Sequence, residues 1–208
     1  MRVEELATIL ESFKDEVLAS IKGIDAKIKG LFDLNKEIEG RLKAVEAKIS
    51  HLEDYSRREN LLFFGIADVK DETAEACESK VMEIIRDKLG IHKEIEFQRV
   101  HRLGRHRRAT RGVNARPIIV RFLRAKDRDL VLRNAFKLKD QGVSLSEDFC
   151  QQTRDKRKML LPHLKNAKKS GKKAFLRGDS LIIEGSSYSV DGNIVRNSRS
   201  GAVLDLGN

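Results

Sequence analysis

A heptad repeat in the N-terminal segment constrains the fold more than any other feature of the sequence. From Ile21 onward, apolar residues recur at alternating steps of three and four, with a sites at positions 21, 28, 35, 42 and 49 and d sites at positions 24, 31, 38, 45 and 52. Asn35 is the one polar residue among these sites. Because a sustained period of about 3.5 residues is typical of coiled coils, we expect residues 1–57 to form a self-associating helix whose register Asn35 helps to fix.

The segment RLKAVE bears on the number of strands in this coiled coil. Arg41 immediately precedes the a-site residue Leu42, and Glu46 immediately follows the d-site residue Val45. An arginine in that place can lie across the apolar seam and pair with a carboxylate of a neighbouring chain. The pattern resembles a short motif of parallel three-stranded coiled coils, so we expect a homotrimer, with a dimer as the alternative.

Beyond residue 57 the pattern changes to that of a small mixed domain. Four segments are typical of strands: LLFFGI at 61–66, IEFQRVHRL at 95–103, RPIIVRF at 116–122 and GVSL at 142–145. Residues 72–91 and 125–140 have the spacing of helices. The order β-α-β-β-α-β is that of ferredoxin-like domains, which include RNA-recognition motifs. We therefore predict an α+β protein, with an N-terminal coiled coil and an RNA-recognition-motif domain at residues 58–147.

The predicted sheet lacks the aromatic residues with which RNA-recognition motifs usually stack on bases. Leu62 replaces the aromatic of the first strand, and Pro117 and Ile119 replace those of the third predicted strand. Stacking on this sheet should therefore be weak, and RNA must be held by other groups.

An arginine-rich stretch between two predicted strands is the main candidate for that role. It contains Arg99, Arg102, Arg105, Arg107, Arg108, Arg111 and Arg116. Guanidinium groups bind phosphate in a bidentate manner and stack on bases, which suits single-stranded nucleic acid. The alternatives are a nuclear-import signal and a solvated basic loop. The tetrapeptide RRAT within the stretch also resembles a kinase site at Thr110.

The charge distribution agrees with a polyanionic partner. The chain has a formal net charge of +10, and residues 99–208 contain 26 Lys and Arg residues against 10 Asp and Glu residues. Such a concentration of positive charge favours nucleic acid, because phosphate contacts dominate the affinity of basic proteins for it.

The C-terminal part is predicted to form a second, smaller α+β domain at residues 148–190, followed by a flexible tail at residues 191–208. Ser146 has the character of a helix cap before a basic amphipathic helix, and short strands should flank the RGDS turn at 177–180.

Other classes of function find little support in the residue pattern. The two cysteines and five histidines have no metal-ligand or redox spacing, and no glycine-rich phosphate loop is present. We therefore predict no catalytic site, no metal and no cofactor. The sequence has no signal-peptide core and no apolar run of membrane-spanning length, so an intracellular, soluble protein is expected.

The ordered combination of these motifs resembles a known family. A coiled coil leading into SRRENLLFFGI, then RRAT and RPIIVRF, then SLSEDFCQQTRDKRKML and KAFLRGDSLIIEG, is similar to the first open-reading-frame protein of LINE retrotransposons over about residues 20–190. The resemblance implies a homotrimer that binds single-stranded RNA, acts as a nucleic-acid chaperone and coats the element's transcript in a ribonucleoprotein particle. Single-stranded DNA is a further ligand it implies, and the cytoplasm or the nucleus is the implied location. It leaves open whether the source is an active element, a truncated copy or a protein adopted by its host.

The resemblance also implies particular RNA-binding residues. Basic positions of the family match Arg58, Arg121, Arg157 and the loop arginines, and an aromatic position matches Phe175, whereas Leu62 stands where the family can have a further arginine. A hypothesis from another class is a structural adaptor, which trimerises through its coiled coil and presents the α/β domain to an acidic protein.

Overall fold

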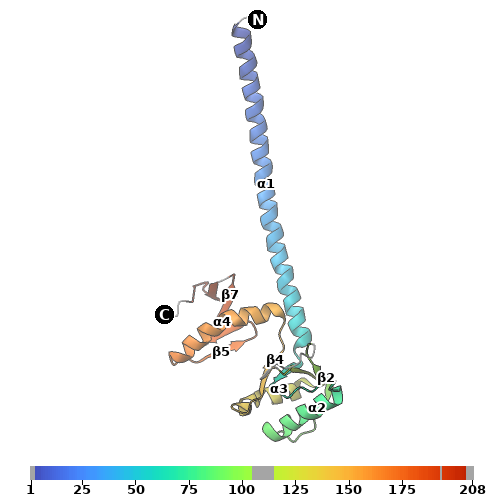
Figure 1. Ribbon diagram of the computed structural model, residues 1–208. Coiled ribbons are helices and arrows are strands. Elements are labelled where there is room, and N and C mark those ends of the chain that lie inside the picture. The colour runs from blue at the N-terminus through green and yellow to red at the C-terminus, as the bar shows by residue number, and fades with distance from the viewer. Residues whose placement is uncertain (1–2, 105–114, 193, 205–208) are drawn as a thin grey trace. The chain divides into compact units, whose positions relative to one another are not determined.

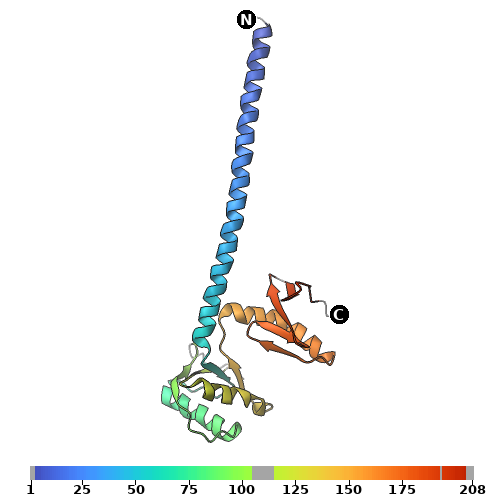
Figure 2. The ribbon, with the colours of Figure 1, turned by 180° about the vertical axis from the view of Figure 1, so that it is seen from behind.

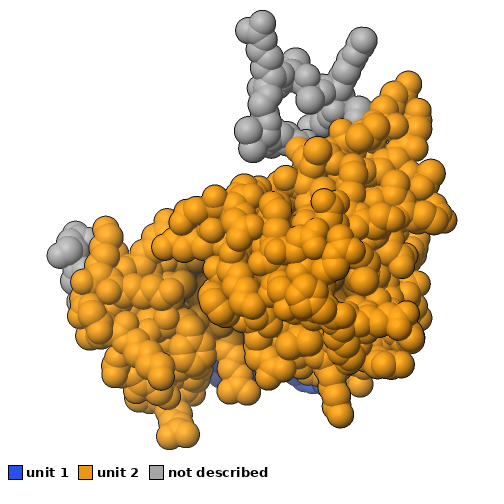
Figure 3. Space-filling view, turned by 90° about the horizontal axis from the view of Figure 1, so that it is seen from below, with its two compact units in different colours: residues 1–49 blue, residues 50–208 orange. Residues whose placement is uncertain are grey.

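The computed structural model describes the backbone of residues 3–104, 115–192 and 194–204, with side chains described from residue 10 onward. The protein is α+β, with a long N-terminal helix and two antiparallel sheets (Figures 1 and 2). The chain divides into two compact units, residues 1–49 and residues 50–208, which Figure 3 colours separately. No helix in the described part of the chain is long and apolar enough to span a membrane.

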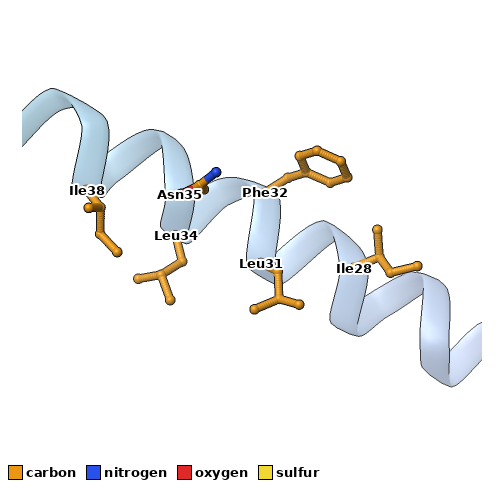
Figure 4. A pocket seen from close by; sticks show the side chains of 6 residues that line it. All are labelled: Ile28, Leu31, Phe32, Leu34, Asn35 and Ile38. Atoms are coloured by element: carbon orange, nitrogen blue, oxygen red, sulfur yellow. The ribbon is translucent and has the colours of Figure 1, made fainter.

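The N-terminal helix α1 spans Val3–Arg57 without interruption. Its apolar a and d side chains lie exposed on the single chain, including the predicted seam residues Leu42 and Val45. In Figure 4, Leu31, Leu34 and Ile38 point to one side of the helix, and Phe32 and Asn35 point to the other. An exposed apolar stripe of this length is unfavourable in water, which is why such helices associate.

The first sheet has four strands in the order β2-β3-β1-β4, with every pairing antiparallel. The strands are β1 (Asn60–Phe64), β2 (Phe97–Arg102), β3 (Ile118–Phe122) and β4 (Ser144–Glu147). The helical elements are α2 (Ala74–Glu83), a π-helical turn η1 (Ile84–Lys88), α3 (Ala125–Arg133) and a 3₁₀ turn η2 (Ala135–Leu138).

The helices pack on one face of this sheet, so the two faces have different roles. Alternate strand residues such as Phe63, Val120 and Phe122 are fully buried against side chains of α2 and α3, including Val81 and Val131. Because side chains alternate along a strand, the intervening residues face the other way. This outer face is the one on which the sequence predicted weak stacking.

The second sheet has four antiparallel strands in the order β5-β6-β7-β8. They are β5 (Ala174–Arg177), β6 (Ser180–Ile183), β7 (Ser186–Asp191) and β8 (Ile194–Asn197), preceded by helix α4 (Gln151–Lys169). Helix α4 lies against β5 and β6 (Figure 1), and Leu160 and Leu181 are buried between them.

Two local expectations differ from the structure. Ser146 was expected to cap the C-terminal helix, but it lies in β4, and α4 begins after Cys150. A flexible tail was expected from residue 191, whereas residues 194–197 form β8, which pairs with β7. In both cases the segment is a strand because it pairs with another strand, β1 for β4 and β7 for β8. The residue pattern within one segment does not show such a pairing.

Candidate nucleic-acid interface

The outer face of the first sheet carries two rows of side chains that cross its strands. One row consists of Arg99 on β2, Arg121 on β3 and Asn60 on β1, which are cross-strand partners. The next row consists of His101, Ile119, Leu62 and Ser146. The first row is basic and the second is mainly apolar, so the face offers charge beside a small apolar surface.

Arg99 and Arg121 form the basic centre of this face. Both side chains are exposed, and they stand directly opposite one another on neighbouring strands. Like charges in that position repel each other, and an anion placed between them removes the repulsion. Glu59, which lies 3.7 Å from Arg121, compensates only part of this charge. The arrangement favours binding of a phosphate group.

The apolar row is accessible only at its β2 and β3 end, because Leu62 on β1 is 7% exposed. Ile119 and Leu62 are aliphatic, as the sequence indicated, but the row ends in the imidazole of His101. Burial, together with the charge of Arg99, lowers the pKa of His101 below its usual value. The ring is therefore uncharged at neutral pH and resembles an aromatic side chain in its stacking properties.

Arg58 borders the basic row just after the end of α1, and Asn60 is the member of the row on β1. Arg58 lies over the ring of Tyr55, with its guanidinium carbon 3.7 Å from the ring centroid, and its Nη1 donates to the Tyr55 carbonyl. Asn60, which the sequence did not single out, is only 9% exposed. Its Nδ2 donates to Asp148, whereas its Oδ1 has no partner among the described residues. Because this atom is buried, Asn60 is not open to a ligand in the described structure.

Arg102 must be removed from the predicted RNA contacts. Its side chain is 3% exposed and points to the inner side of the sheet. Nε donates to Glu72 at 2.6 Å, and the terminal nitrogens donate to the carbonyls of Ile66, Ala67 and Arg116. With these donors occupied by protein groups, Arg102 is a structural residue.

Arg116 is a second arginine of the stretch whose side chain binds groups of the protein itself. It forms a bidentate pair with Asp68, with Nε–Oδ2 and Nη2–Oδ1 distances of 2.8 and 3.0 Å, and its Nη1 donates to the carbonyl of Gly104. Arg102 and Arg116 together hold the two ends of the arginine-rich loop. The remaining predicted contacts in this loop, Arg105, Arg107, Arg108 and Arg111, lie outside the described residues.

The carboxylates of this loop base are strongly held in their charged form. Hydrogen bonds from Arg116 lower the pKa of Asp68 from 3.8 to about 2. Burial by itself would raise the pKa of Glu72, but hydrogen bonds from Arg102 and Lys80 lower it from 4.5 to about 2. We call Asp68, Glu72, Lys80, Arg102 and Arg116 the loop-base cluster.

The C-terminal candidates, Arg157 and Phe175, do not share one surface. Arg157 on α4 has its guanidinium carbon 4.5 Å from the centroid of the Phe149 ring, and its Nη1 donates to the Gly178 carbonyl. Phe175 is 46% exposed and lies on the face of β5 opposite the buried Ala174 and the half-buried Leu176. The side chain next to Phe175 on that face is Arg177, which is also exposed and which the sequence did not single out.

The end of α1 binds the segment between β4 and α4. Asp54 accepts hydrogen bonds from the backbone N–H of Cys150 at 2.7 Å and from Thr153 Oγ1 at 2.6 Å, which caps the first turn of α4. Asp148 is buried and accepts hydrogen bonds from Arg57 and Asn60. The cap that Ser146 was expected to provide therefore comes from Asp54, which lies 96 positions before Cys150 in the sequence.

The described residues thus combine an exposed arginine pair, a short apolar row and the two arginines at the base of the arginine-rich stretch. Guanidinium groups of this kind bind phosphates, and the apolar row accommodates bases. No protein-family model matches the sequence.

Proposed function

We propose that this protein binds single-stranded RNA as a homotrimer, acts as a nucleic-acid chaperone and coats a retrotransposon transcript in cytoplasmic ribonucleoprotein particles. The observation that carries the proposal is the pair formed by Arg99 and Arg121 on the outer face of the first sheet. This face is opposite the helices, and the strand order β2-β3-β1-β4 supports a ferredoxin-like RNA-recognition-motif domain. The second sheet with α4 corresponds to the small C-terminal domain of the LINE-type family that the sequence resembles.

The proposed contact set rests on exposure for Arg58, Arg99 and Arg121 and on the family resemblance for the loop arginines, Arg157 and Phe175. Arg58, Arg99 and Arg121 contact the RNA backbone from the domain itself, the loop arginines extend this contact, and Arg157 and Phe175 contribute from the C-terminal domain. Arg102 and Arg116 have a structural role at the two ends of the loop. A chaperone needs many weak, reversible contacts, which arginines distributed over a face and a loop provide.

The homotrimer rests on the exposed seam of α1. Among the described residues, Arg41 pairs within its own chain with Glu37, at 4.0 Å and at high exposure. Such a pair contributes little, so Arg41 is available for Glu46 of a neighbouring chain. Leu42 and Val45 provide the adjacent apolar contacts, and Asn35 fixes the register. Three copies on one coil would raise a modest affinity per domain through avidity.

A salt titration tests the RNA-binding part of the proposal. The full chain and its Arg105→Ala/Arg107→Ala/Arg108→Ala variant are titrated with fluorescein-labelled oligouridylate at several salt concentrations, with fluorescence anisotropy as the readout. The plot of log affinity against log salt should have a slope of roughly −0.7 per phosphate neutralised, and the variant should flatten it. An unchanged slope would remove the loop from the site.

Sedimentation equilibrium of the same preparations tests the oligomeric state, with a trimer mass expected.

The adaptor hypothesis makes the opposite RNA prediction: affinity for RNA stays at a non-specific level and does not respond to Arg157→Ala or Phe175→Ala.

A further inference from the structure

One exposed aromatic side chain, that of Phe136, lies away from the proposed RNA face. Phe136 on η2 is 74% exposed. It borders a hollow of about 590 Å³ between η2, the following turn and β4. The apolar residues of the hollow are Ala135, Phe136, Leu138, Val143 and Leu145. An exposed aromatic next to an apolar hollow is a common anchor point in protein interfaces.

The hollow lies at an open edge of the first sheet. Strand β4 is the last strand in the order β2-β3-β1-β4, and it pairs only with β1 among the described residues. Ser144 and Leu145 of β4 form one wall of the hollow. An edge strand offers unpaired backbone N–H and C=O groups, which an extended peptide can use for pairing.

The charges around the hollow are mainly positive. Lys139 lines it, and the ammonium groups of Lys88 and Lys137 donate to the backbone carbonyls of Gln141 and Leu89. Asp140 is the one acidic residue of the lining. The carbonyl acceptors of Lys88 and Lys137 bring no compensating negative charge, so an acidic ligand is complementary to this surface.

The chemistry of the surface favours a peptide over RNA. The lining contains no arginine, whose planar group suits phosphate and base stacking. The apolar floor is instead suited to an aliphatic or aromatic side chain, and the adjacent edge strand is suited to a peptide backbone.

We propose that this hollow is a docking site for an acidic, extended segment of a partner protein. The segment pairs with β4, places an apolar side chain against Phe136 and directs its carboxylates toward Lys137 and Lys139. The function is additional to RNA binding and uses a different surface of the same domain.

The test uses the full chain and the labelled peptide Glu-Asp-Phe-Glu-Ile-Asp-Glu, in which two apolar residues share one side of an extended strand. Anisotropy should show binding that weakens with salt. Phe136→Ser should reduce the affinity about tenfold or more, and Lys139→Glu should also reduce it. Leu161→Ser, which changes an exposed apolar residue on α4, is the control and should leave peptide affinity unchanged. A peptide with serine in place of both apolar residues should not bind.

Three results would overturn the proposal. The first is that the peptide does not bind, or binds equally well to Phe136→Ser. The second is that Phe136→Ser lowers oligouridylate affinity, which would assign the surface to RNA. The third is that Phe136→Ser changes the trimer mass in sedimentation, which would make the surface a contact between copies of this chain. Thermal unfolding of each variant verifies that it is folded, and the Lys139→Glu variant provides an independent measurement.

Discussion

Strand β2 contains two arginines with opposite roles. Arg99 is exposed on the outer face, where it stands opposite Arg121, and the register gives it no other basic or acidic cross-strand partner. Arg102 lies on the inner side, where a carboxylate and three carbonyls bind its guanidinium group. The comparison teaches that an arginine-rich sequence contains both exposed arginines and buried structural ones, which the sequence alone does not distinguish.

The largest expected effect comes from the buried arginine. Arg102→Gln should lower the free energy of unfolding by about 3–5 kcal/mol, because it leaves Glu72 buried without its main partner. Urea denaturation measures this change. Arg99→Gln is the matched control on the same strand and should stay within about 0.5 kcal/mol of the wild type. Equal effects of the two substitutions would contradict the division of roles.

The second expected effect is that acid lowers the stability which the loop-base cluster contributes. The pKa values of Asp68 and Glu72 are lowered on folding to about 2, so their contribution to stability is present above their unfolded values of 3.8 and 4.5. That contribution is lost as the pH falls toward about 2. Urea denaturation between about pH 6 and pH 2 should therefore show a falling free energy of unfolding, and Glu72→Gln should make the fall less steep. A pH-independent free energy across this range would show that the cluster contributes no such stability.

The exposed arginines should change RNA binding with little effect on stability. The double variant Arg99→Gln/Arg121→Gln should reduce the slope of log affinity against log salt by roughly 1.4, since two phosphate contacts are lost. Its unfolding free energy should change by no more than about 0.5 kcal/mol. Arg133→Gln, at the exposed end of α3 on the helical side, is the control and should leave the slope unchanged. A loss of folding in the double variant would argue for a structural role of the pair.

The smallest expected effect concerns the cap of α4. Asp54→Ala should lower the free energy of unfolding by about 1 kcal/mol, because the N–H of Cys150 and the hydroxyl of Thr153 lose their acceptor. Asp155→Ala, on the exposed side of α4, should have a smaller effect. Denaturation followed by far-ultraviolet circular dichroism measures both variants.

Regular patterns within a segment were predictable from the sequence. The heptad repeat indicated the long helix α1, and alternation and turn residues indicated β1, β2 and β3 close to their observed limits. The π-helical turn at Ile84–Lys88 was not predicted, because a π turn has no pattern distinct from that of an ordinary helix. Strand β8 was missed because its short sequence becomes a strand only by pairing with β7.

The sequence by itself determined where the charge and the apolar periodicity lie, since both depend only on the order of the residues. It therefore identified the long N-terminal helix with its apolar seam, the mixed sheet and the group of arginines. Tertiary structure decided which arginines are free, because Asp68 and Glu72 approach Arg116 and Arg102 only when the loop after β1 folds against the start of the arginine loop. It also decided that Asp54 caps α4 and that Phe136 stays exposed, because each depends on how segments distant in sequence pack.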